Sequence, residues 1–269
     1  MDIANLFSLE GRIALITGGS RGIGRMIAEG FLAAGAARVY ITARKAAEVE
    51  AAAAELGSRC IALPGDVADM SGIEALAADL TAREARLDIL VNNAGVAWGA
   101  AFDAFPESGW DKVMELNVRT PFFLTQKLHA LLRAGASAEQ PAKVINIASV
   151  DGMKLNPWET YPYQASKAAL IHLTGRTAAR LAGEQILVSA IAPGMFPSKM
   201  NRAADQGEEH VAARIPAGRV GRSEDMAGAA VYLASRAGDY VVGSTLVVDG
   251  GWVNAALPGD FVDALGNPA

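Results

Sequence analysis

Short apolar segments alternate with longer segments of helical spacing along the whole chain. The apolar segments are rich in Val, Ile and Leu and lack polar alternation, which is typical of parallel strands buried on both faces. We predict strands at about 12–17, 37–42, 59–63, 88–92, 142–148, 186–192 and 244–248. We predict helices between them, at about 22–34, 45–56, 71–85, 107–118, 121–134, 161–183 and 223–235.

This alternation predicts the fold class. Strand–helix repeats require right-handed crossovers and build a doubly wound sheet. We therefore predict an α/β chain with a single-domain Rossmann fold, in which a seven-stranded parallel sheet carries helices on both faces. No linker or change of composition marks a second domain within 1–269. Residues 196–222 hold polar, Gly- and Pro-containing stretches around a weak helix, and residues 252–269 form an irregular tail.

Composition narrows the classes of partner and compartment. A chain of 269 residues suits one large α/β domain with a sizeable core. The net charge of −5 argues against nucleic acid or an anionic membrane as the main partner. The single Cys60 excludes an intrachain disulfide and suits the cytoplasm. We find no signal-peptide pattern, no apolar run long enough to span a membrane and no His cluster for a metal.

A glycine-rich run, T-G-G-S-R-G-I-G, stands at residues 17–24 between the first predicted strand and helix. A strand, a glycine turn and a helix in this order are typical of a dinucleotide site. The spacing of Gly18, Gly22 and Gly24 is G-x-x-x-G-x-G. The run also contains G-x-S-x-G around Ser20, the pattern of a serine hydrolase. That alternative is disfavoured because the turn follows the first strand and no His lies near the C-terminus.

Tyr163 is followed four residues later by Lys167 in a predicted helix, and positions i and i+4 share one helix face. A Lys ammonium there can lower the pKa of the Tyr phenol. A tyrosine tuned in this way is a candidate acid for a carbonyl oxygen. The rival Tyr161 has Ala165 at the corresponding position and therefore lacks a lysine partner.

These motifs stand in an order that resembles the classical short-chain dehydrogenase/reductase family along nearly the whole chain. The ordered matches are T-G-x-x-x-G-x-G at 17–24, Asp66-Val67, N-N-A-G at 92–95, Asn117, Ser149, Tyr163, Lys167 and Pro193-Gly194. The segments N-N-A-G-V-A-W-G-A and A-P-G-M-F-P-S-K-M are also similar to rhamnolipid-type 3-oxoacyl reductases. Thirteen residues lie between Ser149 and Tyr163, one more than is usual in the family. The extra residue is expected in the loop between them, where it would reshape the substrate mouth.

The resemblance implies roles for particular residues. Tyr163 would protonate the substrate oxygen, and Lys167 would lower the pKa of Tyr163 and hold the nicotinamide ribose. Ser149 would polarise the carbonyl, and Asn117 would hold a water that relays protons to Lys167. The predicted cofactor-binding residues are Gly18, Ser20, Arg21, Gly22, Ile23, Gly24, Arg44, Asp66, Val67, Asn93, Ala94, Gly95, Tyr163, Lys167, Pro193, Gly194 and Phe196.

The end of the second predicted strand indicates which cofactor is used. NAD enzymes place an acidic residue there, where it binds the ribose 2′-hydroxyl. This chain has I-T-A-R-K instead, with Arg44 and Lys45 at the site and Arg21 in the glycine run. Because arginine is well suited to a 2′-phosphate, we predict NADP(H).

The substrate is predicted to be a small apolar carbonyl compound. The candidate mouth carries apolar residues, namely Trp98, Met153, Leu155, Trp158, Tyr161, Phe196 and Met200. The first candidate is a 3-oxoacyl thioester, and the alternative is a steroid, cyclic or aromatic secondary alcohol. A non-catalytic NADP(H) sensor on the same fold also stays open. From the family likeness we expect residues 196–222 to form a lid, and a homotetramer or homodimer built on helices 107–134 and 161–183.

Overall fold

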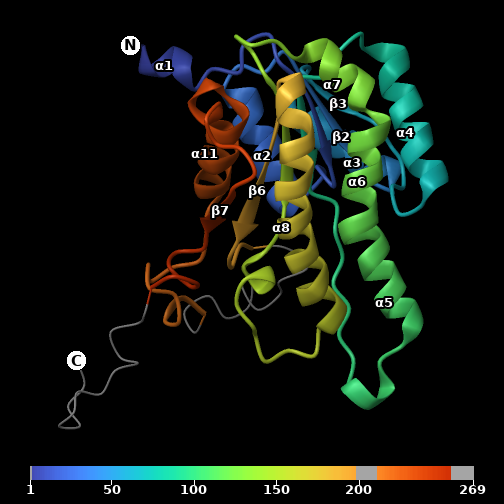
Figure 1. The fold of residues 1–269 in the computed structure, drawn as a ribbon, viewed down its shortest axis with the longest axis vertical. Helices are drawn as coiled ribbons and strands as arrows, with labels where there is room; N and C mark the ends of the chain where they lie inside the picture. Colours follow the sequence, from blue (N-terminus) through green and yellow to red (C-terminus); the bar gives the residue numbers. More distant parts are fainter. Residues whose placement is uncertain (1, 198–210, 256–269) are drawn as a thin grey trace.

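All seven strands of the structure, a computed structural model that describes residues 2–197 and 211–255, form one parallel sheet. The strand order is β3-β2-β1-β4-β5-β6-β7, which is the predicted doubly wound arrangement (Figure 1). The strands are β1 (Ile13–Thr17), β2 (Arg38–Thr42), β3 (Cys60–Ala62), β4 (Ile89–Asn92), β5 (Ala142–Ile147), β6 (Ile186–Pro193) and β7 (Thr245–Val248). Each boundary lies within two residues of the prediction, so the apolar pattern was sufficient to place the strands.

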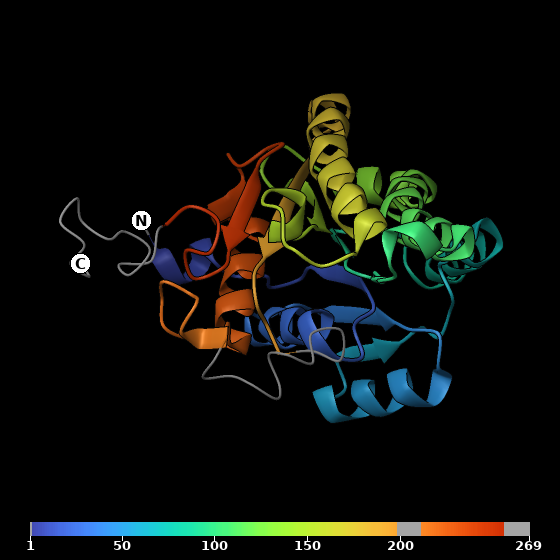
Figure 2. The ribbon, with the colours of Figure 1, turned by 90° about the horizontal axis from the view of Figure 1, so that it is seen from below.

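The helices cover both faces of the sheet, as Figure 2 shows from below. One face is covered by α2 (Gly22–Ala33), α3 (Ala46–Leu56) and α11 (Ser223–Ala234). The opposite face is covered by α4 (Met70–Arg83), α6 (Thr120–Lys127), α7 (His129–Gly135) and α8 (Tyr161–Leu181). α5 (Glu107–Met114) packs against α8, and the short α1 (Ile3–Leu6) was not predicted.

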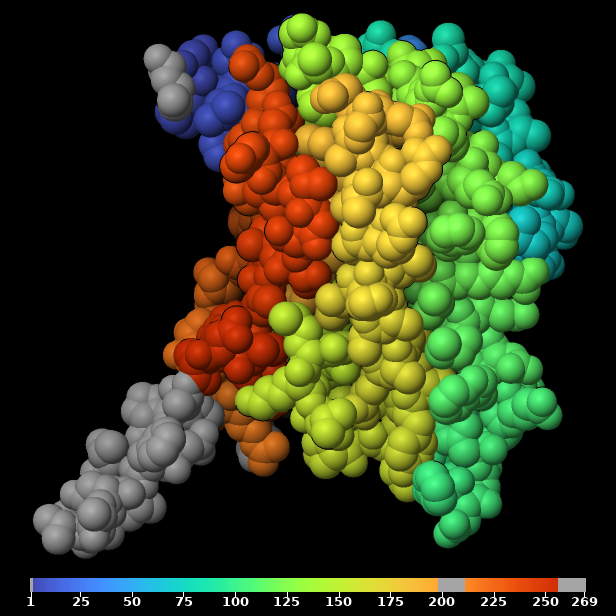
Figure 3. Space-filling model, viewed as in Figure 1, coloured from blue at the N-terminus to red at the C-terminus, as the bar shows by residue number. Residues whose placement is uncertain are grey.

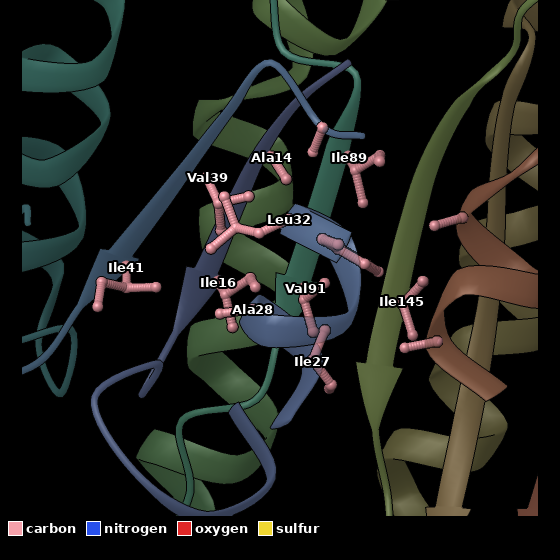
Figure 4. Close-up of a cluster of buried hydrophobic side chains, with 14 of the residues drawn as sticks. Ala14, Ile16, Ile27, Ala28, Leu32, Val39, Ile41, Ile89, Val91 and Ile145 are labelled. Carbon is pink, nitrogen blue, oxygen red and sulfur yellow. The ribbon is translucent and has the colours of Figure 1, made fainter. Parts of the chain in front are cut away.

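Two apolar cores hold these layers together, because alternate residues of each strand face opposite sides of the sheet. Ile16 of β1 packs against the α2 side, whereas its neighbour Leu15 packs against the α4 side. Figure 4 shows Ile27 and Leu32 of α2 facing strand residues such as Val91. This two-sided burial explains why the strand segments are mainly apolar and lack polar alternation.

The predicted helices at 107–118 and 121–134 have different boundaries in the structure. α5 continues through a π-helical turn at Glu115–Arg119 into α6, and the break comes later, at Leu128. A π turn inserts one extra residue into a helix and is frequent at functional sites. Within residues 2–197 and 211–255, no helix is long and apolar enough to cross a membrane.

The order of the strands reverses between β1 and β4, which lie side by side. In doubly wound sheets, ligands bind at such a switch point, beyond the carboxyl ends of the strands. These ends lie at the lower edge of the sheet in Figure 1. The candidate residues are therefore sought in the loops at this edge.

Candidate active site

The glycine-rich turn at 17–24 follows β1 and opens α2, as predicted. Gly18 and Gly22 have φ values of 68° and 53°, a left-handed conformation that glycine adopts without strain. A Cβ on Gly24 would lie 2.4 Å from the Gly18 carbonyl oxygen, so only glycine fits there. Among the described residues, no side chain caps the N-terminus of α2. Its N–H groups and positive dipole end can therefore bind a phosphate.

Asn93 and Thr17 brace this turn against the loop after β4. Asn93 Nδ2 donates to the main-chain oxygens of Thr17 and Gly18 at 2.7 and 3.2 Å. Thr17 Oγ1 accepts from the main-chain N–H groups of Asn93 and Ala94 at 3.0 and 2.9 Å. The N-N-A-G loop therefore supports the turn, and Gly95 lies beside Asn117 and Lys167.

The end of β2 presents one unsatisfied polar atom and one exposed cation. Thr42 Oγ1 is buried, and no hydrogen-bond partner for it occurs among the described residues. Arg44 is exposed two residues later. Arg21 Nη1 lies 3.3 Å from Glu48 Oε2, in an exposed ion pair. A ligand with hydroxyl or phosphate groups could bind all three side chains.

Asp66 and Val67 lie in the loop between β3 and α4, at the edge of the sheet where the strands have their carboxyl ends. The Asp66 carboxylate accepts from the main-chain N–H of Ala68 at 3.1 Å. The main-chain oxygen of Val67 accepts from the Thr120 hydroxyl at 2.6 Å. This second bond ties the loop after β3 to the first residue of α6.

Ser149, Tyr163 and Lys167 come together where β5 meets α8. Ser149 precedes a 3-10 turn, η3 (Val150–Gly152), and its hydroxyl accepts from the main-chain N–H of Asp151 at 3.1 Å. Tyr163 lies close enough to Ser149 for the serine side chain to lower the pKa of the phenol. Lys167 Nζ lies 5.6 Å from the Tyr163 ring centroid and donates to the main-chain oxygen of Ile147 at 2.8 Å.

The ionisation of this group differs from the prediction in one respect. The pKa of Tyr163 is raised to about 12, mainly by burial and also by the nearby Asp151 carboxylate, although the Ser149 side chain acts in the opposite direction. Burial also lowers the pKa of Lys167 to about 8. The direction of the Tyr163 shift is therefore opposite to the one expected, and the part that Lys167 plays in tuning Tyr163 stays a prediction. Desolvation dominates because Lys167 is buried and Tyr163 is half-buried where β5 meets α8.

Asn117 is fully buried in the π-helical turn. Its Oδ1 accepts from the main-chain N–H of Val96, and its Nδ2 donates to Val96 O and Ser166 Oγ, all within 2.9–3.0 Å. Both amide hydrogens are thus used inside the protein. Asn117 fixes the loop after β4 against α8, and its role in holding a water stays a prediction.

The residues predicted at the end of β6 and just after it differ in where they lie. Pro193 ends β6, and Gly194 donates to the main-chain oxygen of Val248 at 2.9 Å, at the edge where the site lies. Phe196 was predicted to contact cofactor and substrate, but its side chain is 3% exposed and packs in the core, so it does not line the substrate mouth. Its contact with the cofactor stays a prediction. Its ring fills the space that a side chain at Gly221 would need, because a Cβ there would lie 2.4 Å away. Met200 lies outside the described residues.

The other residues predicted to form the mouth lie around its rim. Trp98 is partly buried against Gly109 of α5. Met153, Leu155 and Trp158 belong to the loop after η3, and all are exposed. The Tyr161 hydroxyl donates to Glu159 Oε1 at 3.2 Å, and its ring stacks edge-on against those of Phe102 and Phe105. Tyr161 and Tyr163 are two positions apart on α8 and therefore do not share a helix face.

Comparison with known proteins identifies the family. The family model described as enoyl-(acyl carrier protein) reductase matches residues 18–253. The rhamnolipids biosynthesis 3-oxoacyl-[acyl-carrier-protein] reductase of Pseudomonas aeruginosa is 52% identical over 251 residues, which are 91% of this chain and 98% of that one. The chain belongs to the short-chain dehydrogenase/reductase family. It is therefore an oxidoreductase, and the hydrolase interpretation of Ser20 is wrong.

Other members of the short-chain dehydrogenase/reductase family differ in the substrates that their names state. A solved structure described as the Pseudomonas aeruginosa RhlG/NADP active-site complex is 51% identical, with a TM-score of 0.89, over 92% of this chain and 98% of that one. The 2-dehydro-3-deoxy-D-gluconate 5-dehydrogenase of Dickeya dadantii is 38% identical over 254 residues, 93% of this chain and 99% of that one. Membership of the family therefore makes this chain an oxidoreductase and leaves the substrate open.

Three residues at this site were missed by the sequence analysis. Thr17 orders the N-N-A-G loop, and Thr42 presents the unsatisfied hydroxyl. Asp151 lies close enough to raise the pKa values of Tyr163 and Lys167. Thr17 and Thr42 could have been found, since each is the last residue of a predicted strand that ends at the switch point. Asp151 gave no such signal, because its position depends on how η3 packs against α8.

Proposed function

We propose that this protein is an NADPH-dependent carbonyl reductase that acts on an apolar ketone. The observation that carries the proposal is the convergence of Ser149, Tyr163 and Lys167 at the same edge of the sheet as the N-terminus of α2, to which the loop after β4 connects them. Family membership supports the redox chemistry, and the proximity of Ser149 to Tyr163 supports a shared carbonyl-binding role.

The residues at the switch point fit a phosphorylated dinucleotide. The glycines at 18–24 let the chain turn tightly into the start of α2, whose N–H groups have no side-chain cap among the described residues. Thr42 Oγ1 also lacks a partner among the described residues. Arg44 and Arg21 supply positive charge beside that hydroxyl, which favours a 2′-phosphate. The solved RhlG structure contains NADP, which supports the same choice. When bound, NADPH supplies the hydride.

The side chains beyond β5 would then perform the proton chemistry. With a pKa near 12, Tyr163 is a neutral phenol at neutral pH, so its hydroxyl can donate a proton to the carbonyl oxygen. Ser149 can donate a hydrogen bond to the same oxygen and stabilise the negative charge that develops there. Lys167 lies over the Tyr163 ring, where its ammonium would stabilise the phenolate that remains. Asn117 keeps the loop after β4 in place against α8 through its hydrogen bonds with Val96 and Ser166.

The first candidate substrate is a 3-oxoacyl thioester, supported by the 52% identity to a reductase of that class. The exposed apolar rim of Met153, Leu155 and Trp158 supports an apolar substituent. Another secondary alcohol is the alternative, since a 38% identical relative is a sugar-acid dehydrogenase. A homodimer or homotetramer is also proposed, because Trp110 and Phe122 are exposed on α5 and α6.

The test is a panel of ketones and alcohols, scored by oxidation of NADPH or reduction of NADP. The panel should include a 3-oxoacyl thioester, a cyclic ketone, an aryl ketone and a keto sugar acid. Tyr163→Phe should lower kcat by about two to four orders of magnitude and leave NADPH binding intact, because only the acid is removed. Tyr161→Phe is the matched control and should retain activity. Loss of activity in Tyr161→Phe alone would move the acid, and no turnover of any compound would favour a cofactor sensor.

A further inference from the structure

The loop that follows Ser149 contacts the last part of the chain that the structure describes. Lys154 Nζ donates to the main-chain oxygen of Trp252 at 2.9 Å and lies 5.5 Å from the centroid of its indole ring. Figure 3 shows this loop, in yellow-green, beside the red segment at the lower end of the molecule. One side chain thus joins two segments that are 98 positions apart in the sequence.

Trp252 belongs to a small apolar cluster separate from the two cores. Its other members are Met195, Val211, Ile215 and Val220, of which Ile215 and Val220 are buried. Main-chain hydrogen bonds add to the cluster, from Gly221 N to Met195 O at 2.8 Å and from Ala217 N to Gly250 O at 2.9 Å. The described parts of the predicted 196–222 lid therefore lie against Met195 and the segment around residue 250. We call Met195, residues 211–221 and residues 250–252 together the lid base.

The first part of the Ser149 loop is held differently from the part beyond it. A Cβ on Gly152 would lie 2.6 Å from the main-chain carbon of Lys167, so η3 sits directly on the backbone of α8. After η3 the chain leaves α8, and Leu155 is 86% exposed. Lys154 lies where the chain leaves α8. Its contact with Trp252 holds the loop close to the lid base.

We propose that Lys154 is a positioning residue that holds the Ser149 loop against the lid base and so fixes one wall of the substrate mouth. The proposal rests on the proposed function, because the wall matters only if substrate binds beside Ser149. The apolar part of a ketone would lie between this loop and the lid base. Lys154 would then act on substrate affinity and not on proton transfer, which Ser149 and Tyr163 carry out.

Lys154→Met tests the proposal, because it keeps the length of the side chain and removes its charge and its donor. We expect KM for the ketone to rise about two- to fivefold, the effect of losing one exposed cation–π contact, with kcat and NADPH affinity unchanged. Amide hydrogen exchange should become faster in 211–221 and 250–253. Lys154→Arg should restore both values, since a guanidinium can also donate and stack on an aromatic ring.

Lys127→Met is the matched control, because it removes another exposed lysine contact, with Glu74 at 2.7 Å on the far helices α6 and α4. It should change neither KM nor exchange. Unchanged KM and unchanged exchange in Lys154→Met would overturn the proposal, as would a joint loss of kcat, NADPH binding and thermal stability. If the unsubstituted protein reduces no ketone, the proposed function fails, and the exchange comparison still decides whether Lys154 holds the lid base.

Discussion

Arg44 offers the sharpest test of cofactor choice. It is exposed beside the unsatisfied Thr42 hydroxyl, and within residues 2–197 and 211–255 it makes no hydrogen bond or ion pair. Its guanidinium can therefore bind a 2′-phosphate without first leaving another partner. A hydrogen bond to a charged group contributes about 1.5–3 kcal/mol, which corresponds to roughly a 10- to 150-fold change in dissociation constant. We expect Arg44→Ala to weaken NADPH binding by this factor and to leave NADH binding unchanged.

Arg21 should contribute less, because Glu48 already binds it. Glu48 Oε1 also accepts from Lys45 Nζ at 2.8 Å, so one carboxylate holds two cations. To bind a phosphate, Arg21 must first break its exposed ion pair with Glu48, which costs about 0–1 kcal/mol. The loss of NADPH affinity in Arg21→Ala should therefore be smaller than the loss in Arg44→Ala, by a factor of up to about five. Glu48→Gln should strengthen NADPH binding by a similar factor, because it removes a competing negative charge.

The dissociation constants of NADPH and NADH are measured by fluorescence titration of each variant. Arg44→Lys separates charge from geometry, since an ammonium cannot form the two parallel bonds of a guanidinium. We expect it to recover only part of the NADPH affinity. Equal losses for the two cofactors in Arg44→Ala would refute the assignment, and so would a larger loss in Arg21→Ala.

Three further predictions concern stability and pH. Gly24→Ala should destabilise the fold by about 1–3 kcal/mol in urea, because its Cβ would lie 2.4 Å from Gly18 O; Gly228→Ala in α11, with nothing within 4 Å, should not. The kcat/KM of reduction should fall above about pH 8, as Lys167, whose pKa burial lowers to about 8, loses its proton; a flat profile to pH 10 would contradict this. Asp225 has a folded pKa of about 2, below its ordinary value, mainly through Arg219. Its contribution, about 1 kcal/mol for a partly solvated pair, should be present above pH 4 and disappear as pH falls toward 2, and Asp225→Asn should abolish that difference.

The sequence predicted the sheet and the cofactor loop because both depend on local rules. Strands buried on two faces are mainly apolar, as β1 is, and a left-handed turn such as that at Gly18 favours glycine. Tyr163 and Lys167 could be paired from helical spacing alone. These features need no knowledge of which elements pack together.

The predictions failed where packing between distant segments decides the outcome. Phe196 is buried because Gly221, 25 positions later, leaves room for its ring, and no local pattern indicates this. The π-helical turn that places Asn117 depends on its bonds to Val96 and Ser166 on other elements. The raised pKa of Tyr163 likewise follows from tertiary burial, which a sequence motif does not contain.

The unusual spacing between Ser149 and Tyr163 shows how the site tolerates an extra residue. Ser149 is fixed by β5 and η3, whereas Tyr163 is fixed by the first turns of α8, so neither depends on the loop between them. The close contact of Gly152 with the Lys167 backbone locks η3 to α8 before the loop begins. At the far end of the loop, Glu159 accepts from the main-chain N–H of Phe102 at 3.2 Å. An inserted residue can therefore change the substrate mouth without moving the residues proposed for the chemistry, which is why variation in substrate is expected in this loop before variation in reaction type.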